Sequence, residues 1–176
     1  MAYTGVVKPT NKIVAGGTPL VQELMIETAT NMYPGRLVKK GTNDDDIVVN
    51  TAAGNALGWL GYEQADPAFM PTDVDTAYAA NDMAPILNGG HFYIVGRLAS
   101  GQNVTKGTPL VAAANGELTA ASGLTVASGA TQVTSSAANG AILAGTLGTQ
   151  GIVVAIAEQS VDASGAAADI VVRSLI

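Results

Sequence analysis

The stretch "VTKGTPLVAAANGELTAA", residues 104–121, decides the fold class of this chain. It reads as a strand, a turn at Lys106-Gly107, a second strand, a turn at Asn115-Gly116 and the start of a third strand. Its strands consist of small apolar residues and threonines, and almost none of its side chains could act as a nucleophile or metal ligand. The stretch therefore predicts consecutive short strands whose role is packing or contact.

Short runs rich in β-branched residues continue this pattern along most of the chain. Each run is bounded by Gly, Asn, Asp or Pro, which is typical of strands joined by turns. Residues 20–33 allow a short helix or a strand, and the turn at Pro34-Gly35 favours the strand. The sequence thus predicts an all-β fold, either a small β-barrel or a sandwich-like barrel. The expected strand regions are 35–41, 46–52, 56–65, 83–89, 91–99, 102–121, 151–161 and 168–175.

Two segments stand apart from this predicted barrel. Residues 1–18 alternate short apolar pairs with Gly, Pro, Asn and Lys, which predicts an extended N-terminal arm, with a disordered terminus as the alternative. Residues 122–150 form a long insertion rich in Ala, Gly, Ser and Thr without any charge, which we expect to fold back as a β-excursion or to lie against another subunit. A length of 176 residues fits one domain, so we predict a single β-barrel domain over residues 19–176.

An internal repeat links the two halves of the chain. "GRLVKKGT" (35–42) followed by "ALGWLGYEQA" (56–65) resembles "GRLASGQNVTKGTPL" (96–110) followed by "GIVVAIAEQSV" (151–161). Gly-Arg-Leu, Lys-Gly-Thr and Glu-Gln recur in the same order. Two β-rich halves of like pattern would suit a barrel built from paired meanders, and chance convergence of glycine-rich turns is the alternative.

The charge of the chain limits its partners. Only 12% of the residues are charged and the net charge is -6. Binding to a nucleic-acid backbone depends on clustered Lys and Arg, so we predict no nucleic-acid partner. No basic residue lies between Gly41 and Gly96, and this segment predicts a negative surface. Its acidic residues are Asp44, Asp45, Asp46, Glu63, Asp66, Asp73, Asp75 and Asp82.

The chain has no cysteine, no long uninterrupted apolar run and no signal-peptide pattern at its N-terminus. The missing thiol excludes disulfides and thiolate catalysis. We therefore predict a protein that is made in a cytoplasm and has no membrane partner.

The acidic residues give little indication of a metal site. Asp44, Asp45 and Asp46 are consecutive at a strand entrance, where they would point to different sides, so we interpret them as solvated turn residues. Asp73 and Asp75 could lie on one face of an extended segment and hold a cation, together with Asp66, or a Lys of a partner, but a rigid surface loop between two strands explains them as well. We predict no metal and no cofactor.

Catalytic residues are not indicated either. His91, the sole histidine, follows Gly89-Gly90 and has the position of the first residue of a strand leaving a turn. A general base needs a nucleophile or positioned water and an orienting acid, and no motif supplies them. Trp59 is interpreted as a core or subunit-contact aromatic. We predict a protein that is not an enzyme.

The order of these motifs resembles a known family. The matching segments are "PGRLVKKGT", "NALGWLGYEQA", "GGHFYIVGRLASGQNVTKGTPLVAAANGELTAA" and "GIVVAIAEQSVDASGAAADIVVRSLI". They cover residues 34–176 and are similar to the small β-barrel decoration, or cement, proteins that coat the heads of tailed bacterial and archaeal viruses. The insertion at 122–150 and the Asp-rich loop at 66–82 depart from that family's pattern.

The resemblance implies a structural protein of the virion, assembled in the host cytoplasm. It would bind the outer surface of the head and cement neighbouring major capsid protein subunits, as a homotrimer. Family members often bind through an N-terminal arm, which would fit residues 1–18. The capsid-binding residues of that arm would be Tyr3, Thr4, Val6, Val7, Lys8, Pro9, Lys12 and Ile13.

Two other functions remain open from the sequence. A carbohydrate-binding or host-adhesion module on a fibre or spike would need exposed aromatic platforms, and two Phe, one Trp and five Tyr provide little material. A hydrolase would have to be built from Asp73, Asp75 and His91.

Overall fold

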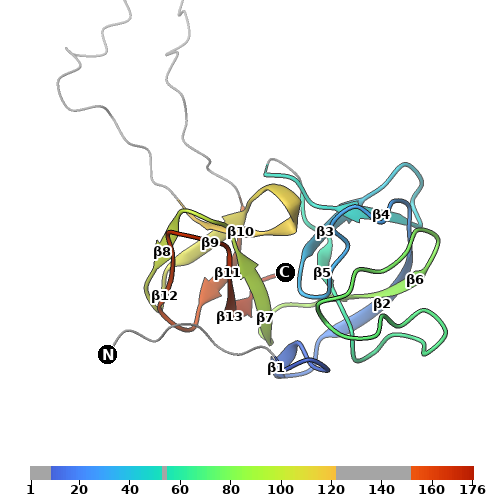
Figure 1. Ribbon diagram of the computed structural model, residues 1–176, viewed down its shortest axis with the longest axis horizontal. Coiled ribbons are helices and arrows are strands. Elements are labelled where there is room, and N and C mark those ends of the chain that lie inside the picture. The colour runs from blue at the N-terminus through green and yellow to red at the C-terminus, as the bar shows by residue number, and fades with distance from the viewer. Residues whose placement is uncertain (1–8, 53–54, 122–151) are drawn as a thin grey trace, which may run out of the picture.

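The computed structural model describes residues 9–52, 55–121 and 152–176, and its regular structure is almost entirely β-strand (Figure 1). The prediction of an all-β barrel fold is confirmed, and the structure contains two barrels side by side. The insertion at 122–150 and arm residues 1–8 lie outside the described residues. The bounds given for the arm and for a single domain stay a prediction.

The first barrel is a closed ring of five strands in the order β2-β4-β3-β5-β6. Residues 20–26 form its first strand, as favoured over a helix, with Leu24 and Ile26 buried in the barrel core. The strands are β2 (Leu20–Ile26), β3 (Leu37–Lys40), β4 (Asp46–Val49), β5 (Gly58–Leu60) and β6 (Met83–Asn88).

The second barrel is closed by the pairing of β13 with β7, and β8 and β12 form a two-stranded ribbon beside it. The stretch 104–121 supplies two of its strands. Both predicted turns are present, with positive φ at Gly107, Asn115 and Gly116. The elements are β7 (Tyr93–Leu98), β8 (Gln102–Val104), β9 (Pro109–Ala112), η1 (Ala114–Gly116), β10 (Leu118–Ala120), β11 (Val153–Ala157), β12 (Val161–Ala163) and β13 (Ala168–Ser174).

The two barrels have the same strand topology. In each, the first strand pairs in parallel with the third and antiparallel with the fifth. The second strand pairs antiparallel with the third and fourth, and the fourth with the fifth. The equivalent strands are β2 and β7, β3 and β9, β4 and β10, β5 and β11, and β6 and β13.

The repeat seen in the sequence coincides with this topology in part. Glu63-Gln64 follows β5 and Glu158-Gln159 follows β11, so these pairs occupy equivalent places. The Gly-Arg-Leu match does not, because Leu37 begins β3 whereas Leu98 ends β7. The repeat therefore describes two similar barrels in tandem rather than paired meanders of one barrel.

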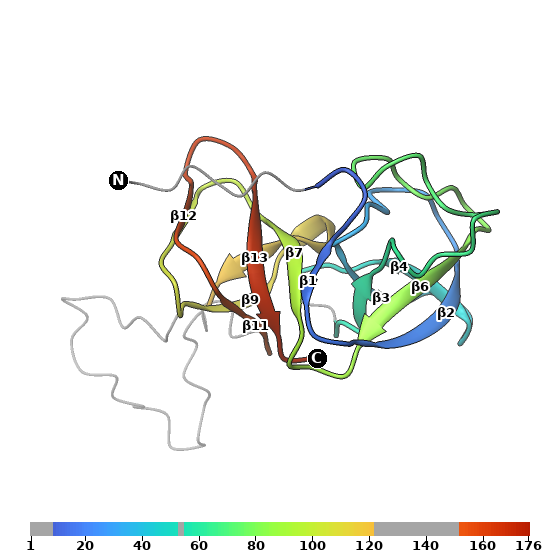
Figure 2. The same cartoon turned by 90° about the horizontal axis from the view of Figure 1, so that it is seen from below.

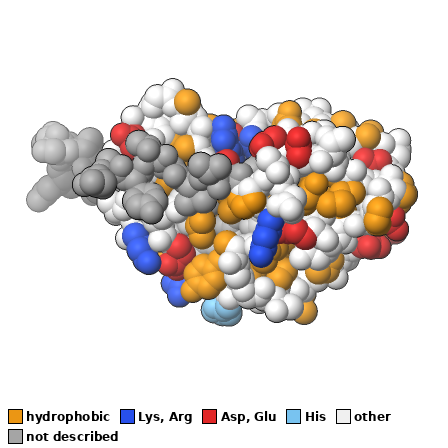
Figure 3. Space-filling view, turned by 60° about the horizontal axis from the view of Figure 1, so that its bottom comes forward, with side chains coloured by type: hydrophobic (Ala, Val, Ile, Leu, Met, Phe, Trp, Pro, Cys, Tyr) orange, Lys and Arg blue, Asp and Glu red, His pale blue; other side chains and the backbone are white. Residues whose placement is uncertain are grey.

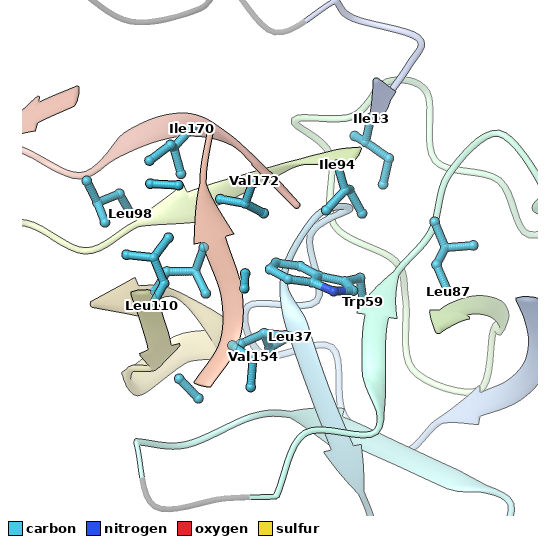
Figure 4. Close-up of a cluster of buried hydrophobic side chains, with 14 of the residues drawn as sticks. Ile13, Leu37, Trp59, Leu87, Ile94, Leu98, Leu110, Val154, Ile170 and Val172 are labelled. Atoms are coloured by element: carbon cyan, nitrogen blue, oxygen red, sulfur yellow. The ribbon is translucent and has the colours of Figure 1, made fainter. Parts of the chain in front are cut away.

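One hydrophobic cluster runs through the second barrel and into the first. Trp59 of β5 is fully buried at the centre of this cluster, between strands of both barrels (Figure 4). Its indole N–H donates a hydrogen bond to Ser174 Oγ at 3.0 Å, which ties β5 to the end of β13. The sequence interpretation of Trp59 as a core residue is thus confirmed. A second cluster, built around Leu24, Ile47 and Ile86, fills the first barrel.

The N-terminal segment is packed where we expected an arm. β1 (Val14–Gly16) pairs antiparallel with β7 of the second barrel, although it precedes the first barrel in the chain. Ile13 and Val14 are buried, and their N–H groups donate to Glu63 Oε1 at 2.7 and 2.9 Å. Residues 9–12 are exposed. The first buried residues along the described part of the predicted arm are therefore Ile13 and Val14, and Ile13 belongs to the core.

Candidate functional site

The junction of the two barrels holds the most buried ion pair of the described residues. Arg36, just before β3, approaches Glu117, just before β10, at 2.7 Å, with side-chain exposures of 15% and 17%. The Arg36 guanidinium also donates to the carbonyl oxygen of Asn115 at 3.0 Å. Asn31 Nδ2 donates to Asn115 Oδ1 at 3.1 Å. The Asn115-Gly116 turn of the second barrel is thereby held against the first.

Two glycines allow the barrel backbones to approach each other at this junction. A Cβ atom at Gly35 would lie 2.5 Å from the carbonyl oxygen of Val95, and one at Gly116 would lie 2.6 Å from that of Leu37. Both glycines have positive φ, a conformation that side chains disfavour. The N–H of Gly116 donates to the carbonyl oxygen of Asn50 at 2.9 Å. These contacts make the two barrels one packed body.

A crevice of about 170 Å³ opens at this junction. Its charged residues are largely neutralised within the chain, because Arg36 pairs with Glu117 and Arg97 pairs with Asp169 at 3.0 Å. Neither His91 nor Asp73 lines it, so the crevice does not bring the residues of the hydrolase hypothesis together. Its lining residues are Tyr33, Pro34, Arg36, Val74, Asp75, Val95, Gly96, Arg97 and Asp169.

The acidic residues singled out in the sequence take structural roles. Asp66 Oδ1 accepts from the N–H of Ala68 at 2.8 Å, and Asp73 Oδ1 accepts from the N–H of Asp75 at 3.0 Å and the hydroxyl of Thr76 at 2.8 Å. These are turn-stabilising bonds of the kind that Asp favours in loops. Among the residues that the structure describes, no three His, Asp or Glu side chains are grouped so as to hold a metal ion.

Two of these sequence interpretations need correction. Asp46 is buried rather than solvated, because it begins β4 and its Oδ2 accepts from Asn43 Nδ2 at 2.6 Å. Asp44 does lie in solvent, within 3.1 Å of Lys40 Nζ. His91 is exposed and left-handed, with φ of 59°, and β7 starts only at Tyr93. It therefore ends the turn rather than opening the strand.

Tyr78 is a buried ionisable group of the first barrel. Burial raises the pKa of its hydroxyl well above the ordinary value, and the neighbouring Tyr62, Asp82 and Glu63 raise it further. The hydroxyl donates to the carbonyl oxygen of Gly61 at 3.0 Å. Tyr78 thus stays protonated and fastens the long loop between β5 and β6 to the barrel.

One end of the molecule is apolar and exposed. The turn from β1 to β2, the loop from β6 to β7 and the C-terminal residues lie together along its lower edge in Figure 2. Leu20 and Leu175 are 67% and 40% exposed there, and Tyr93 is also exposed. A Cβ atom at Gly89 would touch Leu20, and one at Gly90 would touch the backbone of Leu175, so these residues are neighbours. We call Leu20, Tyr93 and Leu175 the apolar end.

Sequence reasoning missed the junction and the apolar end. Arg36 and Glu117 stand beside the quoted turns, in "PGRL" and "NGEL", but nothing in the sequence pairs residues so far apart. The aromatic side chains fit the adhesion hypothesis poorly, since Tyr93 alone among the described ones is exposed. No described helix has the length and hydropathy needed to cross a membrane.

The fold and its surfaces define an all-β protein. The polar residues of its junction and loops form hydrogen bonds and ion pairs within the chain, and its apolar end is exposed and available for contact. The chain belongs to the XM1 gp53 minor capsid protein family, whose model matches residues 5–175. No curated protein matches the chain. Family membership makes this a viral capsid-associated protein, supports a structural role in the virion, and favours a role other than catalysis.

Proposed function

We propose that this protein binds the outer surface of a viral head and cements neighbouring major capsid protein subunits. The observation that carries the proposal is the apolar end, an exposed apolar surface on a member of a minor capsid protein family. Exposed apolar patches on a folded domain mark interaction sites. Contacts of this kind need no active site, and repetition over a shell makes a modest interface effectively tight.

The exposed N-terminal residues provide the second contact of this proposal. Pro9 and Lys12 are exposed. The chain that follows them is fixed by the hydrogen bonds of Ile13 and Val14 to Glu63 and by the pairing of β1 with β7, and we call this fixed segment the root. Tyr3, Thr4, Val6, Val7 and Lys8 would extend from this root to a neighbouring subunit of the shell. The protein acts as a homotrimer in this proposal, because three apolar ends at a three-fold position would contact three capsid subunits.

The test uses shells that lack this protein and counts the copies that bind to them. Leu175→Asp and Tyr93→Asp should lower occupancy by about tenfold or more, since a charge at a desolvated contact is costly. Leu57→Asp is the matched control, because Leu57 is 43% exposed but directly precedes β5 and is not part of the apolar end. Full occupancy by both variants of the apolar end would refute this contact surface.

A further inference from the structure

The two barrels differ at the first half of their first strand. β7 pairs with β13 on one side. On its other side, β1 pairs with the first half of β7, and β10 pairs with its last residue. β2 pairs with β6 along its length, but β4 pairs only with Met25 and Ile26. No strand among the described residues covers the first half of β2 on that side. We call Leu20–Leu24 on this side the open edge.

The open edge has hydrogen-bonding groups directed outward. The N–H groups of Met25 and Glu27 donate to carbonyl oxygens of Asp45 and Ile47, on the side of β4. Backbone groups alternate in direction along a strand, so those of Val21 and Glu23 point to the same side, beyond the start of β4. Residues 20–23 are all exposed, with Val21 at 47%. An uncovered strand edge readily accepts another strand.

We propose that the N-terminal residues 1–8 of a second copy of this chain add to the open edge as a strand. The inference gives residues 1–8 a second copy of this chain as their partner, where the proposed function gives them a subunit of the shell, and it rests on that function only for its setting. The second barrel supplies the precedent, because N-terminal residues Val14–Gly16 already cover the equivalent edge of β7. Residues 1–8 include Val6-Val7, a β-branched pair suited to a strand.

Charge favours this occupant. Residues 20–88, which span the first barrel, contain ten acidic and three basic residues. The chain before Glu23 contains Lys8 and Lys12 and no acid. Figure 3 shows acidic side chains over the right-hand end of the face, where the first barrel lies, and no basic ones there. Two first barrels would repel one another, whereas a basic arm is attracted to one.

The geometry favours a second copy over the arm's own barrel. The described chain before β1 and the start of β2 lie at opposite ends of β1 (Figure 2). Eight extended residues span about 26 Å, enough to bridge to a neighbouring molecule. The contact is head-to-tail, with the arm of one copy on the barrel of the next, and three such contacts can close a ring.

The main test is self-association of the full-length protein in solution, measured by sedimentation over a range of concentrations. Val21→Lys should weaken association by about tenfold or more, since it places a positive charge on the open edge to which the basic arm is proposed to bind. Leu57→Lys, with the same charge and a similar exposure, should change it by less than about twofold. Lys8→Glu should weaken association too, and more at low salt.

A second measurement reads the proposed strand directly. The amides of Val21 and Glu23 should exchange hydrogen at least about tenfold more slowly in the assembled protein than in the Val21→Lys variant. Circular dichroism and melting of each variant check that the barrels remain folded. A wild-type chain that stays monomeric, or equal effects of Val21→Lys and Leu57→Lys, would overturn the proposal. Because this experiment contains no shells, its failure would not decide whether the apolar end binds a shell.

Discussion

The two barrels share one strand topology and differ in what lies outside it. The first carries the long loop between β5 and β6, which holds Asp66, Asp73 and Asp75, and has ten acidic residues against three basic ones. The second carries the β8–β12 ribbon, and residues 93–174 have four acidic and three basic residues. The comparison teaches that the buried residues of the strands determine the barrel topology. The connecting loops and the charged residues can vary and give each barrel a different surface.

The barrels also differ at equivalent core positions. Trp59 and Val154 each precede a Glu-Gln pair by four residues, in β5 and β11. Val154 faces its own barrel cluster, whereas Trp59 of the first barrel is buried in the cluster of the second. The indole thus joins the two barrels.

The largest expected effect is that of Trp59→Ala. The change removes a buried side chain and its bond to Ser174, and should lower the free energy of unfolding by about 3–5 kcal/mol. Val154→Ala should lower it by about 2 kcal/mol, because less apolar surface is lost. Denaturant unfolding followed by fluorescence and circular dichroism measures both. Equal losses would mean that the shared cluster does not couple the barrels.

A smaller difference separates two glycines that precede equivalent strands. Gly35 and Gly107 both have positive φ, and only Gly35 has a backbone oxygen where a Cβ would go. Gly107→Ala should cost about 1 kcal/mol from backbone strain alone, and Gly35→Ala about 3 kcal/mol because Val95 must also move. Thermal melting checks the order, and a milder effect at Gly35 would show that the junction yields easily.

The contribution of each ion pair to the free energy of unfolding should increase with its burial. Removing Glu117 with Ala leaves Arg36 largely buried without its carboxylate and should cost about 2 kcal/mol. The Arg97–Asp169 pair is more exposed, at 36% and 22%, so Asp169→Ala should cost about 1 kcal/mol or less. Double-mutant cycles isolate each pair. A larger coupling energy for Arg97 and Asp169 than for Arg36 and Glu117 would contradict this dependence on burial.

The smallest effect concerns Asp162 at the surface of the second barrel. The side-chain and backbone hydrogen bonds from Ser164 lower the pKa of its carboxyl group. A lowered pKa in the folded state stabilises the fold above the unfolded pKa, and this contribution is lost as the pH falls through the folded pKa. An NMR titration should show the lowered pKa, and Ser164→Ala should raise it. An unchanged pKa in that variant would assign the shift elsewhere.

The strands could be read from the sequence because their signals are local. The turn glycines and the alternation of apolar residues placed all eight expected strand regions, and the Glu-Gln pairs indicated the repeat. The number of barrels could not be read in the same way, because closure depends on pairings such as β2 with β4 and β7 with β10 that join distant residues. The same limit explains why Arg36 and Glu117 were not paired.

The N-terminal arm shows where local reasoning stops. Residues 9–18 contain Pro9 and two glycines, a composition typical of an extended segment, and the chain there is indeed short of regular structure. The burial of Ile13 depends on Glu63 and on the edge of β7, some 50 and 80 residues away in sequence. The interpretations of the insertion at 122–150 and of residues 1–8 stay predictions, because these segments lie outside the described residues.

The fastening of β1 has a mechanical consequence. A pull on the N-terminus acts along β1, and the load divides at Ile13 and Val14, whose N–H groups are held by Glu63 of the first barrel while the Ile13 carbonyl accepts from Val95 of the second. The hydrogen bonds on the two sides would have to shear together, rather than unzip one by one. In the proposed role, a shell that swells under internal pressure would therefore load both barrels through β1 at the same time.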